Sequence, residues 1–331
     1  MSKLRAAVIG LGMMGRNHAR VLTSLEGVDL VAVADPANSA QDAIIGPSIF
    51  SSVDDVLAAE IDYAVVAVPT AYHLEVGLQL AQAGVHALIE KPLADSTESA
   101  EMLADAFEKA GLVGATGHIE RYNPSLQSAR KRLAAGDLGE VYQIATRRQG
   151  PFPGRISDVG VVKDLATHDI DLTMWVTQRN FQSVAGQTAH RSGREHEDLV
   201  AFVGLLDGDI VTNHLVNWMS PLKERITIIT GERGTYVANT LTADLTFYAN
   251  GTVNSEWSTL ARFRGVSEGE ILRYAIAKPE PLLTEHQEFR NAVLGKSADI
   301  VTLRQGTRVV EVAEAVLASA ATAKTVTFPV A

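Results

Sequence analysis

The first 120 residues alternate short apolar runs with longer segments in which apolar positions recur every three or four residues. The short runs predict strands and the periodic segments predict helices, because side chains repeat with these two periods in the two structures. A chain in which strands and helices alternate forms right-handed βαβ units, so we expect a parallel sheet with helices on both faces. Asp95 and Glu98 have the spacing of a capping box at the last of these helices. The predicted strands cover residues 5–10, 28–35, 62–69, 85–92 and 112–118, and the predicted helices cover 16–25, 72–84 and 96–111.

A different pattern begins after about residue 121. Most apolar runs now follow one another with few helices between them, which favours a largely antiparallel sheet. We therefore predict an α/β fold with two domains, a doubly wound parallel sheet in residues 1–121 and a second α/β domain in residues 122–331. The predicted strands cover 141–148, 183–190, 199–206, 209–218, 224–230, 234–239 and 245–250, and the predicted helices cover 123–136, 161–172, 284–295 and 307–322.

The composition narrows the classes of function that these domains can serve. The chain is 46% hydrophobic and 21% charged, which is ordinary for a protein with a packed core. Its formal net charge of −10 argues against a nucleic-acid or anionic membrane surface. The chain has no cysteine, which excludes disulfides, thiolate metal sites and cysteine nucleophiles, and no apolar run approaches the roughly 18 residues of a membrane-spanning helix. We expect a cytoplasmic protein that binds neither nucleic acid nor a membrane.

Residues 10–15, GLGMMG, follow the first predicted strand and open the first predicted helix. In this context GxGxxG is the fingerprint of a dinucleotide site. Gly10 permits the tight turn, Gly12 lets the backbone approach a pyrophosphate, and Gly15 allows the helix to pack closely on the strand. Met13 and Met14 lie at the helix N-terminus, where free N–H groups would receive the phosphate.

Asp35 ends the second predicted strand, 20 residues after Gly15. At this spacing its carboxylate would accept hydrogen bonds from the ribose hydroxyls of the adenosine. Its negative charge would repel a 2′-phosphate, so we expect NAD as the cofactor rather than NADP. The alternative is a glycine-rich turn followed by a solvated aspartate.

Two further stretches fall at the carboxyl ends of predicted parallel strands, the edge at which open α/β sheets bind ligands. Glu90 and Lys91 precede a proline in EKP, and Pro69 is followed by Thr70 and His73. We predict that these five residues contact the cofactor. A surface lysine beside a turn-setting proline, and a proline that merely ends a strand, are the alternatives.

Residues 161–172, VVKDLATHDIDL, place Asp164, His168 and Asp171 on one face of the predicted helix, and Trp175 extends this face at the rim of a cleft. A histidine with a near-neutral pKa can take the proton from a hydroxyl as hydride leaves the carbon. The same face could instead hold a metal, but no cysteine or second histidine cluster supports one, so we expect none. The third interpretation is a solvated polar face, and this is the role that we give to Asp171.

The candidate substrate contacts lie around the start of the second domain. Arg148 and Arg155, with Arg147, bracket the loop GPFPGR and could hold a carboxylate or a diphosphate, although solvated arginines are an equal alternative. Arg121, Tyr122 and Asn123 could reach the cleft, and Asn123 before Pro124 also has the position of a helix N-cap. We interpret Trp218, Lys223 and Arg225 as sheet and loop residues, with a substrate contact as the alternative.

Together these motifs resemble the Gfo/Idh/MocA family of NAD(P)-dependent oxidoreductases over essentially the whole chain. The markers, in the family's order, are GLGMMGRNH, VADP, VAVPT, ALIEKPLA and KDLATHDIDL. EKP combined with a downstream DxxxH is far more specific than GxGxxG alone. The resemblance implies an N-terminal Rossmann domain and a C-terminal α/β domain with a large open, mainly antiparallel sheet. That sheet commonly forms the subunit interface in the family, so we expect a homodimer or homotetramer.

The resemblance also implies roles for individual residues. Lys91 and His168 would be the acid/base pair around the substrate hydroxyl, Asp164 would bind the sugar, and Glu90 and Lys91 would touch the nicotinamide end of the cofactor. GHIERYNP, REHEDL and NWMSPLKER resemble the branch that contains UDP-N-acetylglucosamine 3-dehydrogenases. We therefore predict NAD-dependent oxidation of a sugar ring hydroxyl, with a nucleotide sugar as substrate. A polyol, inositol or aldose dehydrogenase, or a regulator that senses NAD and sugar without turnover, are the alternatives.

Overall fold

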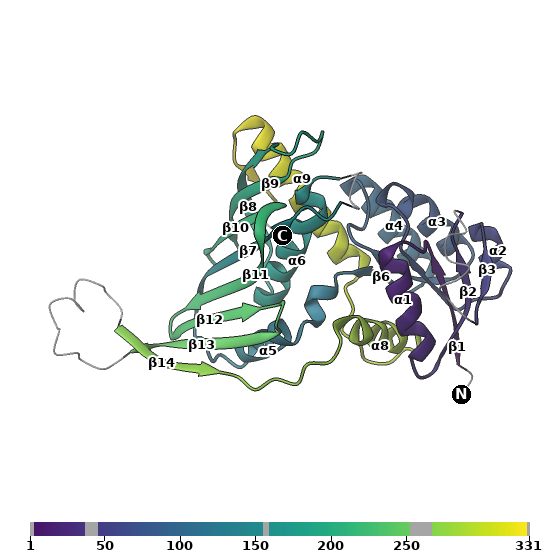
Figure 1. The fold of residues 1–331 in the computed structure, drawn as a ribbon, viewed down its shortest axis with the longest axis horizontal. Helices are drawn as coiled ribbons and strands as arrows, with labels where there is room; N and C mark the ends of the chain where they lie inside the picture. The colour runs from purple at the N-terminus through teal and green to yellow at the C-terminus, as the bar shows by residue number, and fades with distance from the viewer. Residues whose placement is uncertain (1–2, 37–45, 155–158, 252–266, 330–331) are drawn as a thin grey trace. The chain divides into compact units, whose positions relative to one another are not determined.

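The computed structural model describes residues 3–36, 46–154, 159–251 and 267–329 (Figure 1). The chain divides into two compact units. The first contains Met1–Ile119 and Glu280–Glu314, and the second contains Glu120–Pro279 and Ala315–Ala331. In the described part of the chain, no helix combines the length and the apolar character needed to cross a membrane.

A six-stranded parallel sheet forms the centre of the first unit, in the order β3-β2-β1-β4-β5-β6. The strand order reverses between β1 and β4, which is the topology of a doubly wound fold and places a switch point beside the end of β1. The apolar runs reflect burial on both faces, as the complete burial of Ala6, Ala7 and Val8 shows. The strands are β1 (Leu4–Ile9), β2 (Val28–Ala34), β3 (Ser48–Phe50), β4 (Tyr63–Val66), β5 (His86–Glu90) and β6 (Gly114–Gly117).

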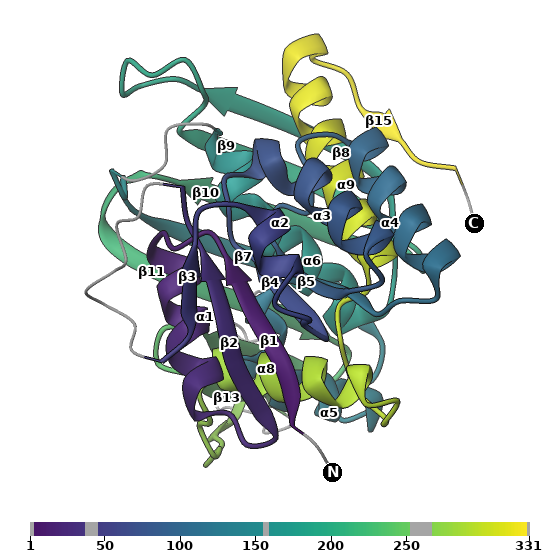
Figure 2. The same ribbon diagram turned by 90° about the vertical axis from the view of Figure 1, so that its right-hand side faces the viewer.

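Helices cover both faces of this sheet (Figure 2). On one face α3 and α4 lie side by side, and Leu80, Leu103 and Phe107 belong to the core that they share with the strands. On the other face α1 packs with α8, and Leu22 and Phe289 join the second core. The helices are α1 (Met13–Ser24), α2 (Val53–Leu57), α3 (His73–Gln82), α4 (Thr97–Ala110) and α8 (Pro281–Val293), with a 3₁₀ turn η1 (Thr70–Tyr72).

Residues 280–314 pack with the first unit, although the predicted boundary at residue 121 assigned them to the second domain. Phe289 of α8 is 1% exposed, and its ring centroid lies 5.4 Å from that of Tyr63 on β4. Leu303, the first residue of α9 (Leu303–Thr322), belongs to the core on the α3 and α4 face. A single division at residue 121 therefore does not describe these helices. Their periodicity shows that they have an apolar face, but not which sheet buries it.

The start of α4 differs from the predicted capping box. Ser96, not Asp95, is the N-cap, and its hydroxyl oxygen accepts the backbone N–H of Ser99 at 3.2 Å. Both Asp95 and Ser96 are residue types that cap helices, so the sequence alone did not separate the two positions.

A nine-stranded mixed sheet forms the second unit, in the order β14-β13-β12-β11-β7-β10-β9-β8-β15 (Figure 1). Only β7 and β10 pair in parallel in the described sheet, and the other pairs are antiparallel. The fold-class prediction is thus confirmed, although the predicted strands did not include β14 and β15. The strands are β7 (Val141–Pro151), β8 (Phe181–Ala189), β9 (Leu199–Leu206), β10 (Ile210–Asn217), β11 (Met219–Gly231), β12 (Gly234–Asn239), β13 (Asp244–Gly251), β14 (Ser267–Arg273) and β15 (Val326–Thr327).

Two helices of the second unit pack against this sheet and against each other. The first, α5 (Pro124–Ala134), lies on β12 and β13, and the second, α6 (Thr167–Thr177), lies on β7. A short π-helical segment, η3 (Val162–Ala166), leads directly into α6, and a 3₁₀ turn, η2 (Ile119–Tyr122), precedes α5. These segments carry most of the predicted substrate contacts and two of the predicted catalytic residues.

Candidate active site

The glycine turn joins β1 to α1 with very little space around two of its glycines. Gly10 has a φ of +90°, and a Cβ there would lie 2.6 Å from the carbonyl oxygen of Ala67. A Cβ on Gly15 would lie only 1.8 Å from the carbonyl oxygen of Gly10. Side chains at either position would force the turn, the helix and the β4 loop apart, so the two glycines fit the roles predicted for them.

Gly12 is different, because its α-carbon faces open space. No heavy atom lies within 4 Å of a Cβ built on it, and Gly12 is the N-cap of α1 without a side chain to bond the first N–H groups. The next residue, Met13, is 61% exposed, and Met14 is half-buried. An open, uncapped helix N-terminus offers N–H donors and a positive dipole to an anion, so the turn fits the pyrophosphate of a dinucleotide.

Asp35 follows β2 and contacts the same turn. Its Oδ2 accepts the backbone N–H of Leu11 at 2.8 Å, and the N–H of Gly10 bonds to Ala34 O at 2.8 Å. The end of β2 therefore holds the glycine turn in place through both main-chain and side-chain contacts. The sequence predicted a ribose contact for Asp35 and did not predict this bond to the turn.

His73 is buried, whereas Pro69 is exposed and Thr70 is half-buried at the edge of the sheet. The His73 ring is 1% exposed and lies between main-chain carbonyls, with Nε2 at 3.0 Å from Val68 O and Nδ1 at 3.0 Å from Pro92 O. Burial lowers its pKa despite these bonds. His73 thus links the loop after β4 to the loop after β5. Because its ring is buried between them, it supports the carboxyl edge of the sheet through these two loops.

Glu90 points into the first unit while Lys91 follows it at the carboxyl edge of the sheet. Glu90 is 8% exposed, and its Oε1 lies 2.8 Å from Nε2 of His18. Its Oε2 accepts the backbone N–H of Lys91 at 3.1 Å. Burial raises the pKa of Glu90, but the bond to His18 and the charges of His18 and Lys91 outweigh it and lower the pKa. The Glu90 carboxylate therefore stays ionised beside Lys91, which is half-buried.

In the second unit, Asp164 and His168 lie in two different kinds of helix. Asp164 belongs to the π-helical η3, and His168 lies in the first turn of α6. They are 4% and 9% exposed. The sequence predicted a regular helix through this segment, so it missed the wider π-helical turn, a feature frequently found at functional sites.

The helix face that was predicted to lie at a cleft rim is buried. Asp171 is 0% and Trp175 3% exposed, and every residue from Thr167 to Val176 is buried. Arg121 donates from Nε to Asp171 Oδ2 at 2.9 Å and from Nη2 to Oδ1 at 2.5 Å. The prediction of a solvated polar face for Asp171 is therefore wrong. Its carboxylate is half of a buried bidentate pair that joins η2 to α6.

Arg148 is also held by internal carboxylates. It is 3% exposed, and it donates from Nε to Asp169 Oδ2 at 2.8 Å and from Nη1 to Glu120 Oε1 at 2.9 Å. Burial lowers the pKa of Arg148, but the charges of Asp169 and Glu120 outweigh it and raise the pKa. A substrate contact would require Arg148 to leave these partners. Arg155, the other predicted arginine, lies outside the described residues.

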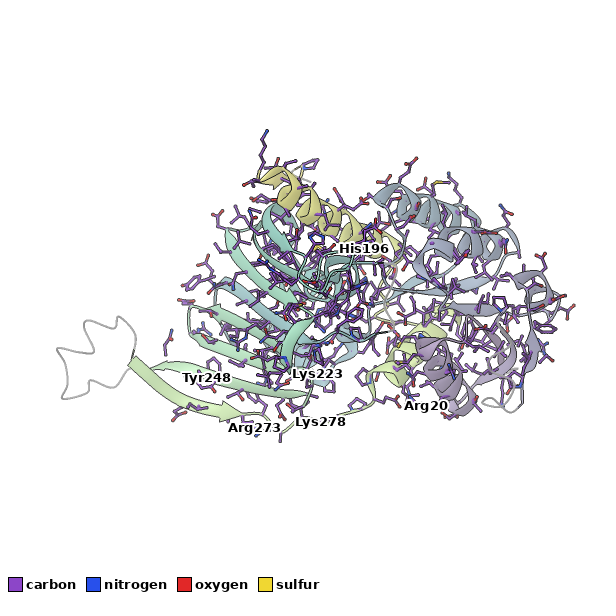
Figure 3. All side chains as sticks on the ribbon, turned by 45° about the horizontal axis from the view of Figure 1, so that its top comes forward. Arg20, His196, Lys223, Tyr248, Arg273 and Lys278 are labelled. Atoms are coloured by element: carbon purple, nitrogen blue, oxygen red, sulfur yellow. The ribbon has the colours of Figure 1, made fainter. Side chains whose placement is uncertain are left out.

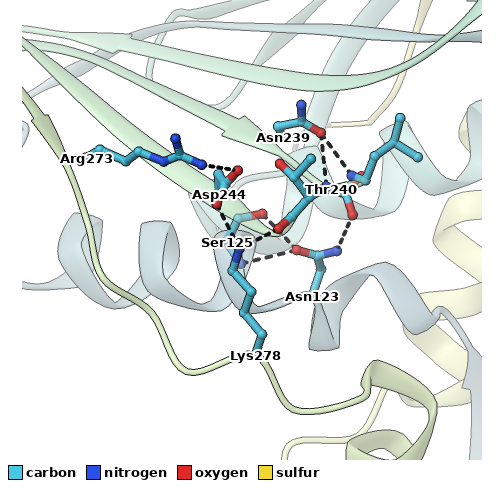
Figure 4. A network of polar contacts seen from close by, with 9 residues as sticks. Asn123, Ser125, Asn239, Thr240, Asp244, Arg273 and Lys278 are labelled. Atoms are coloured by element: carbon cyan, nitrogen blue, oxygen red, sulfur yellow. Dashed lines mark hydrogen bonds and ion pairs between the residues drawn. The ribbon is translucent and has the colours of Figure 1, made fainter.

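Asn123 caps α5, as its position before Pro124 predicted (Figure 4). Its Oδ1 accepts the N–H of Ser125 at 3.1 Å, and its Nδ2 donates to Thr240 O at 2.9 Å. Both ends of the amide are thereby used inside the second unit. Tyr122 is 4% exposed. The structure thus gives Asn123 a local structural duty, the alternative to its predicted substrate contact.

Sequence reasoning missed Glu197, which anchors the segment that leads into η3. Its Oε1 accepts the N–H of Val162 at 3.0 Å, and its main-chain oxygen accepts the N–H of Val161 at 2.9 Å. A Cβ on Gly160 would lie 2.0 Å from Oε1, so glycine is needed for this approach. The resemblance had pointed to REHEDL, but no periodicity connects a loop glutamate to a helix 35 residues earlier.

Arg225 lies on β11, which agrees with its interpretation from the sequence as a sheet or loop residue and leaves the alternative of a substrate contact open. It is half-buried, and its Nη1 donates to Gln149 O at 3.4 Å and to Glu224 O at 3.3 Å, both of which are long contacts. Burial and the charge of Arg148 lower its pKa. Arg225 is thus a weakly bonded cation on the strand next to the one that carries Arg148.

The geometry defines the class of the first unit. An uncapped helix after a tight glycine turn, with an acid at the end of the next strand, makes it a dinucleotide-binding unit. Among the described residues there is no group of three or more histidine or acidic side chains that could hold a metal ion. The chain belongs to the Gfo/Idh/MocA oxidoreductase family. The family's NAD-binding Rossmann fold matches residues 4–118, and its C-terminal α/β domain matches residues 130–328.

Individual relatives act on different sugars and polyols, according to their names. UDP-N-acetylglucosamine 3-dehydrogenase of Acidithiobacillus ferrooxidans is 38% identical over 181 residues, which are 54% of this chain and 55% of that enzyme. The NAD(+)-dependent scyllo-inositol 2-dehydrogenase of Bacillus subtilis is 28% identical over 194 residues, which are 56% of this chain and 57% of that enzyme. The matches thus span little more than half the length of these curated relatives.

Similarity to solved structures extends over the whole chain. The structure of the Acidithiobacillus ferrooxidans enzyme, GnnA, superposes with a TM-score of 0.82 at 28% identity, covering 96% of this chain and 98% of that one. GenD2 from gentamicin A biosynthesis, solved in complex with NAD, gives a TM-score of 0.83 at 25% identity, covering 100% of this chain and 97% of that one.

Proposed function

We propose that the protein is an NAD-dependent dehydrogenase that oxidises a ring hydroxyl of a sugar, with a nucleotide sugar such as UDP-N-acetylglucosamine as substrate and its 3-hydroxyl as the oxidised group. The observation that carries this proposal is the buried Glu90 carboxylate, which accepts the backbone N–H of Lys91 at the edge of the sheet where open α/β folds bind ligands. The same edge carries the glycine turn.

The first unit would hold the cofactor by its pyrophosphate and its adenosine ribose. The N–H groups of Gly12, Met13 and Met14 would receive the pyrophosphate, and Asp35 would accept the ribose hydroxyls. A 2′-phosphate would meet the negative charge of Asp35, which favours NAD over NADP. Pro69, Thr70 and Glu90 would contribute contacts toward the nicotinamide end. Bound NAD would supply the hydride acceptor.

In this proposal, side chains of the protein accept and transfer the proton of the substrate hydroxyl. Lys91 and His168 take up and pass on the hydroxyl proton as the carbon loses hydride, and Asp164 accepts a hydrogen bond from the sugar and orients it. A positioned acid/base group contributes about 100- to 10,000-fold to such a step.

A nucleotide sugar is favoured over a free sugar because it carries a diphosphate, for which Arg225 is a candidate contact. The long contacts of its Nη1 leave most of the fork without a strong partner among the described residues. Because arginine binds phosphate in a bidentate manner, we propose Arg225 as a diphosphate contact ahead of Arg148, with its two internal carboxylates. Arg121 and Tyr122 would shape the site, and the contact of Arg155 stays a prediction.

The test is to mix the protein with NAD and, separately, UDP-N-acetylglucosamine, myo-inositol and glucose, and to follow NADH absorbance. We expect NADH with the nucleotide sugar, and NMR of the product should show a ketone at carbon 3. Arg225→Gln should raise KM for the nucleotide sugar by about 10-fold or more, the effect of losing a charged hydrogen bond.

A polyol dehydrogenase is the second candidate, favoured by the similarity to scyllo-inositol 2-dehydrogenase. It predicts NADH formation with inositols, none with UDP-N-acetylglucosamine, and no effect of Arg225→Gln. A protein that binds NADH but oxidises none of these compounds would instead support the sensing regulator.

We also propose a homodimer or homotetramer formed through the uncovered face of the nine-stranded sheet. Apolar side chains on this sheet remain open, with Val203 51% and Val211 49% exposed, on the adjacent strands β9 and β10. Tyr248 on β13, paired with Ile271 of β14, is also exposed (Figure 3). Light scattering coupled to size exclusion measures the mass, and Val203→Lys with Val211→Glu should yield the monomer.

A further inference from the structure

Four buried titratable side chains lie together inside the first unit, behind the turn at Lys91. His18 comes from α1, Glu90 from the end of β5, and Glu285 and His286 from α8, with exposed fractions of 0%, 8%, 1% and 0%. Buried polar groups are costly unless they are bonded, so such a cluster in an otherwise apolar core needs a physical reason.

Three of these side chains form a chain of short contacts. His18 Nε2 lies 2.8 Å from Glu90 Oε1, and His18 Nδ1 lies 2.8 Å from His286 Nε2. The two rings meet edge to face, with centroids 5.0 Å apart and an interplanar angle of 86°. The other oxygen of Glu90 accepts the Lys91 N–H. The contacts therefore run from α8 through α1 to the backbone of Lys91.

Counting the protons in these contacts shows that the hydrogen bond between His18 and Glu90 is kept. An ionised carboxylate only accepts, so His18 Nε2 must carry the proton of that bond. The contact between His18 and His286 needs a single proton, which either ring can provide. Burial and the charge of His18 lower the pKa of His286, which favours its neutral form, and burial with the charge of Glu90 raises the pKa of Glu285. Of the two carboxyl groups, Glu90 is the one whose pKa is lowered, which favours its charged form.

The packing leaves room for this arrangement and connects it to the dinucleotide turn. A Cβ on Gly117 would lie 3.1 Å from Cδ of Glu90, so the neighbouring strand leaves the carboxylate its space. His18 is three residues after Gly15, on the buried face of the helix that begins at the glycine turn. The helix α1 thus offers its N-terminus to the dinucleotide, and its residue His18 contacts Glu90.

We propose that His18, backed by His286, is a positioning residue that fixes the Glu90–Lys91 turn relative to the dinucleotide turn. A displacement of about 1 Å in a reacting group can cost a factor of about 100 in rate, so a buried brace at this point affects turnover without touching the substrate. The kinetic consequence rests on the proposed function, whereas the placement of Lys91 does not.

The experiment compares His18→Leu, which removes the donor, with His18→Gln, whose amide can still donate to Glu90. His286→Leu and His286→Gln form a second pair on the other helix, and Glu285→Gln is the matched control, a buried neighbour with nearly unchanged shape. Amide hydrogen exchange is measured on a peptide spanning residues 87–94 and, for the same unit, on β4. NADH affinity is measured by fluorescence titration, and kcat and KM with whichever sugar is oxidised.

In His18→Leu we expect faster exchange at Lys91 with β4 unchanged, NADH affinity within about threefold of wild type, and kcat lower by about 10- to 100-fold. His18→Gln should restore both, His286→Leu should show the same pattern more weakly, and Glu285→Gln should resemble wild type. The proposal is overturned if exchange rises equally in β4, if His18→Gln is as impaired as His18→Leu, or if exchange at Lys91 does not change. If no sugar is oxidised, the proposed function fails, and exchange at Lys91 still decides the positioning role.

Discussion

The Asp35 carboxylate accepts the backbone N–H of Leu11 at 2.8 Å, so the acid that ends β2 also holds the middle of the glycine turn. This bond shapes the turn that we propose as the pyrophosphate site. We also propose that the charge of Asp35 selects a ribose without a 2′-phosphate.

Asp35→Ala is expected to weaken NADH binding by about 10-fold or more, since a charged hydrogen bond to the ribose is lost. The ratio of NADH to NADPH affinity should fall at the same time, because the repulsion of the 2′-phosphate disappears. Fluorescence titration with both cofactors measures this ratio. Asp29→Ala, at an exposed position of the same strand, is the control, and an unchanged ratio in Asp35→Ala would contradict the selecting role.

Substitution by alanine should weaken cofactor binding at Gly12 and lower the stability of the fold at Gly15. Gly12→Ala meets no atom within 4 Å, so its free energy of unfolding should change by less than about 0.5 kcal/mol while NADH affinity falls about 10-fold. Gly15→Ala places a methyl group against the Gly10 carbonyl and should destabilise the fold by about 3 kcal/mol. Urea unfolding and NADH titration of both variants separate the effects, and equal destabilisation would refute the assignment.

Lys91→Ala tests the proposed proton transfer. We expect kcat/KM to fall by about 100- to 10,000-fold while NADH binding stays measurable, because the side chain acts on the hydroxyl proton. Lys109→Ala, on the exposed end of α4, is the control and should keep full activity. Near-normal turnover of Lys91→Ala would rule out the catalytic role.

The Arg121–Asp171 pair should behave as a structural pair. Arg121→Met leaves a buried carboxylate without its partner and should lower the free energy of unfolding by about 3–5 kcal/mol. The double variant Arg121→Met, Asp171→Leu should recover much of that loss, since no unpaired charge remains. Urea unfolding of the single and double variants measures the coupling, and full additivity of the two losses would be the contrary result.

His214 on β10 should make stability depend on pH. Burial lowers its pKa to about 3, whereas an unfolded histidine titrates near 6.5. The unfolded state therefore binds more protons below about pH 6.5, so this contribution is complete above that pH and is lost as the pH falls toward about 3.

His214→Phe should reduce the acid slope of the unfolding free energy by up to about 1.4 kcal/mol per pH unit in that window. Urea unfolding between about pH 7 and pH 5 measures the slope. The variant also removes a bond to Thr146, but that loss does not depend on pH in this range. His190→Gln, at an exposed position, should keep the wild-type slope, and so would His214→Phe if its burial had no such effect.

Much of the first unit was legible in the sequence because its signals are local. The apolar runs of β1, β4 and β5 are continuous since both faces of a parallel sheet are covered, and the glycines are fixed by contacts within one turn. The Asn123 cap was likewise visible, because a cap depends on the residues beside it.

The partners of charged residues were not legible in this way. Asp171 read as a solvent-facing residue because an isolated helix with Asp164, His168 and Asp171 on one face has a polar stripe, yet Arg121 from η2 buries it. The sequence predicted a substrate contact for Arg148, because no local pattern indicates that Asp169 and Glu120 are its partners. Ion pairs between distant segments carry no periodic signal.

The sequence by itself determined the fold class, the glycine turn and the order of the family's motifs, since each depends on spacing along the chain. Only the tertiary structure decided that α8 packs with the parallel sheet, that a π-helical turn holds Asp164, and that His18 and His286 stand behind Glu90. The physical reason is that hydrogen bonds and burial between elements depend on which surfaces meet, and that choice is made by the whole core rather than by any local stretch of residues.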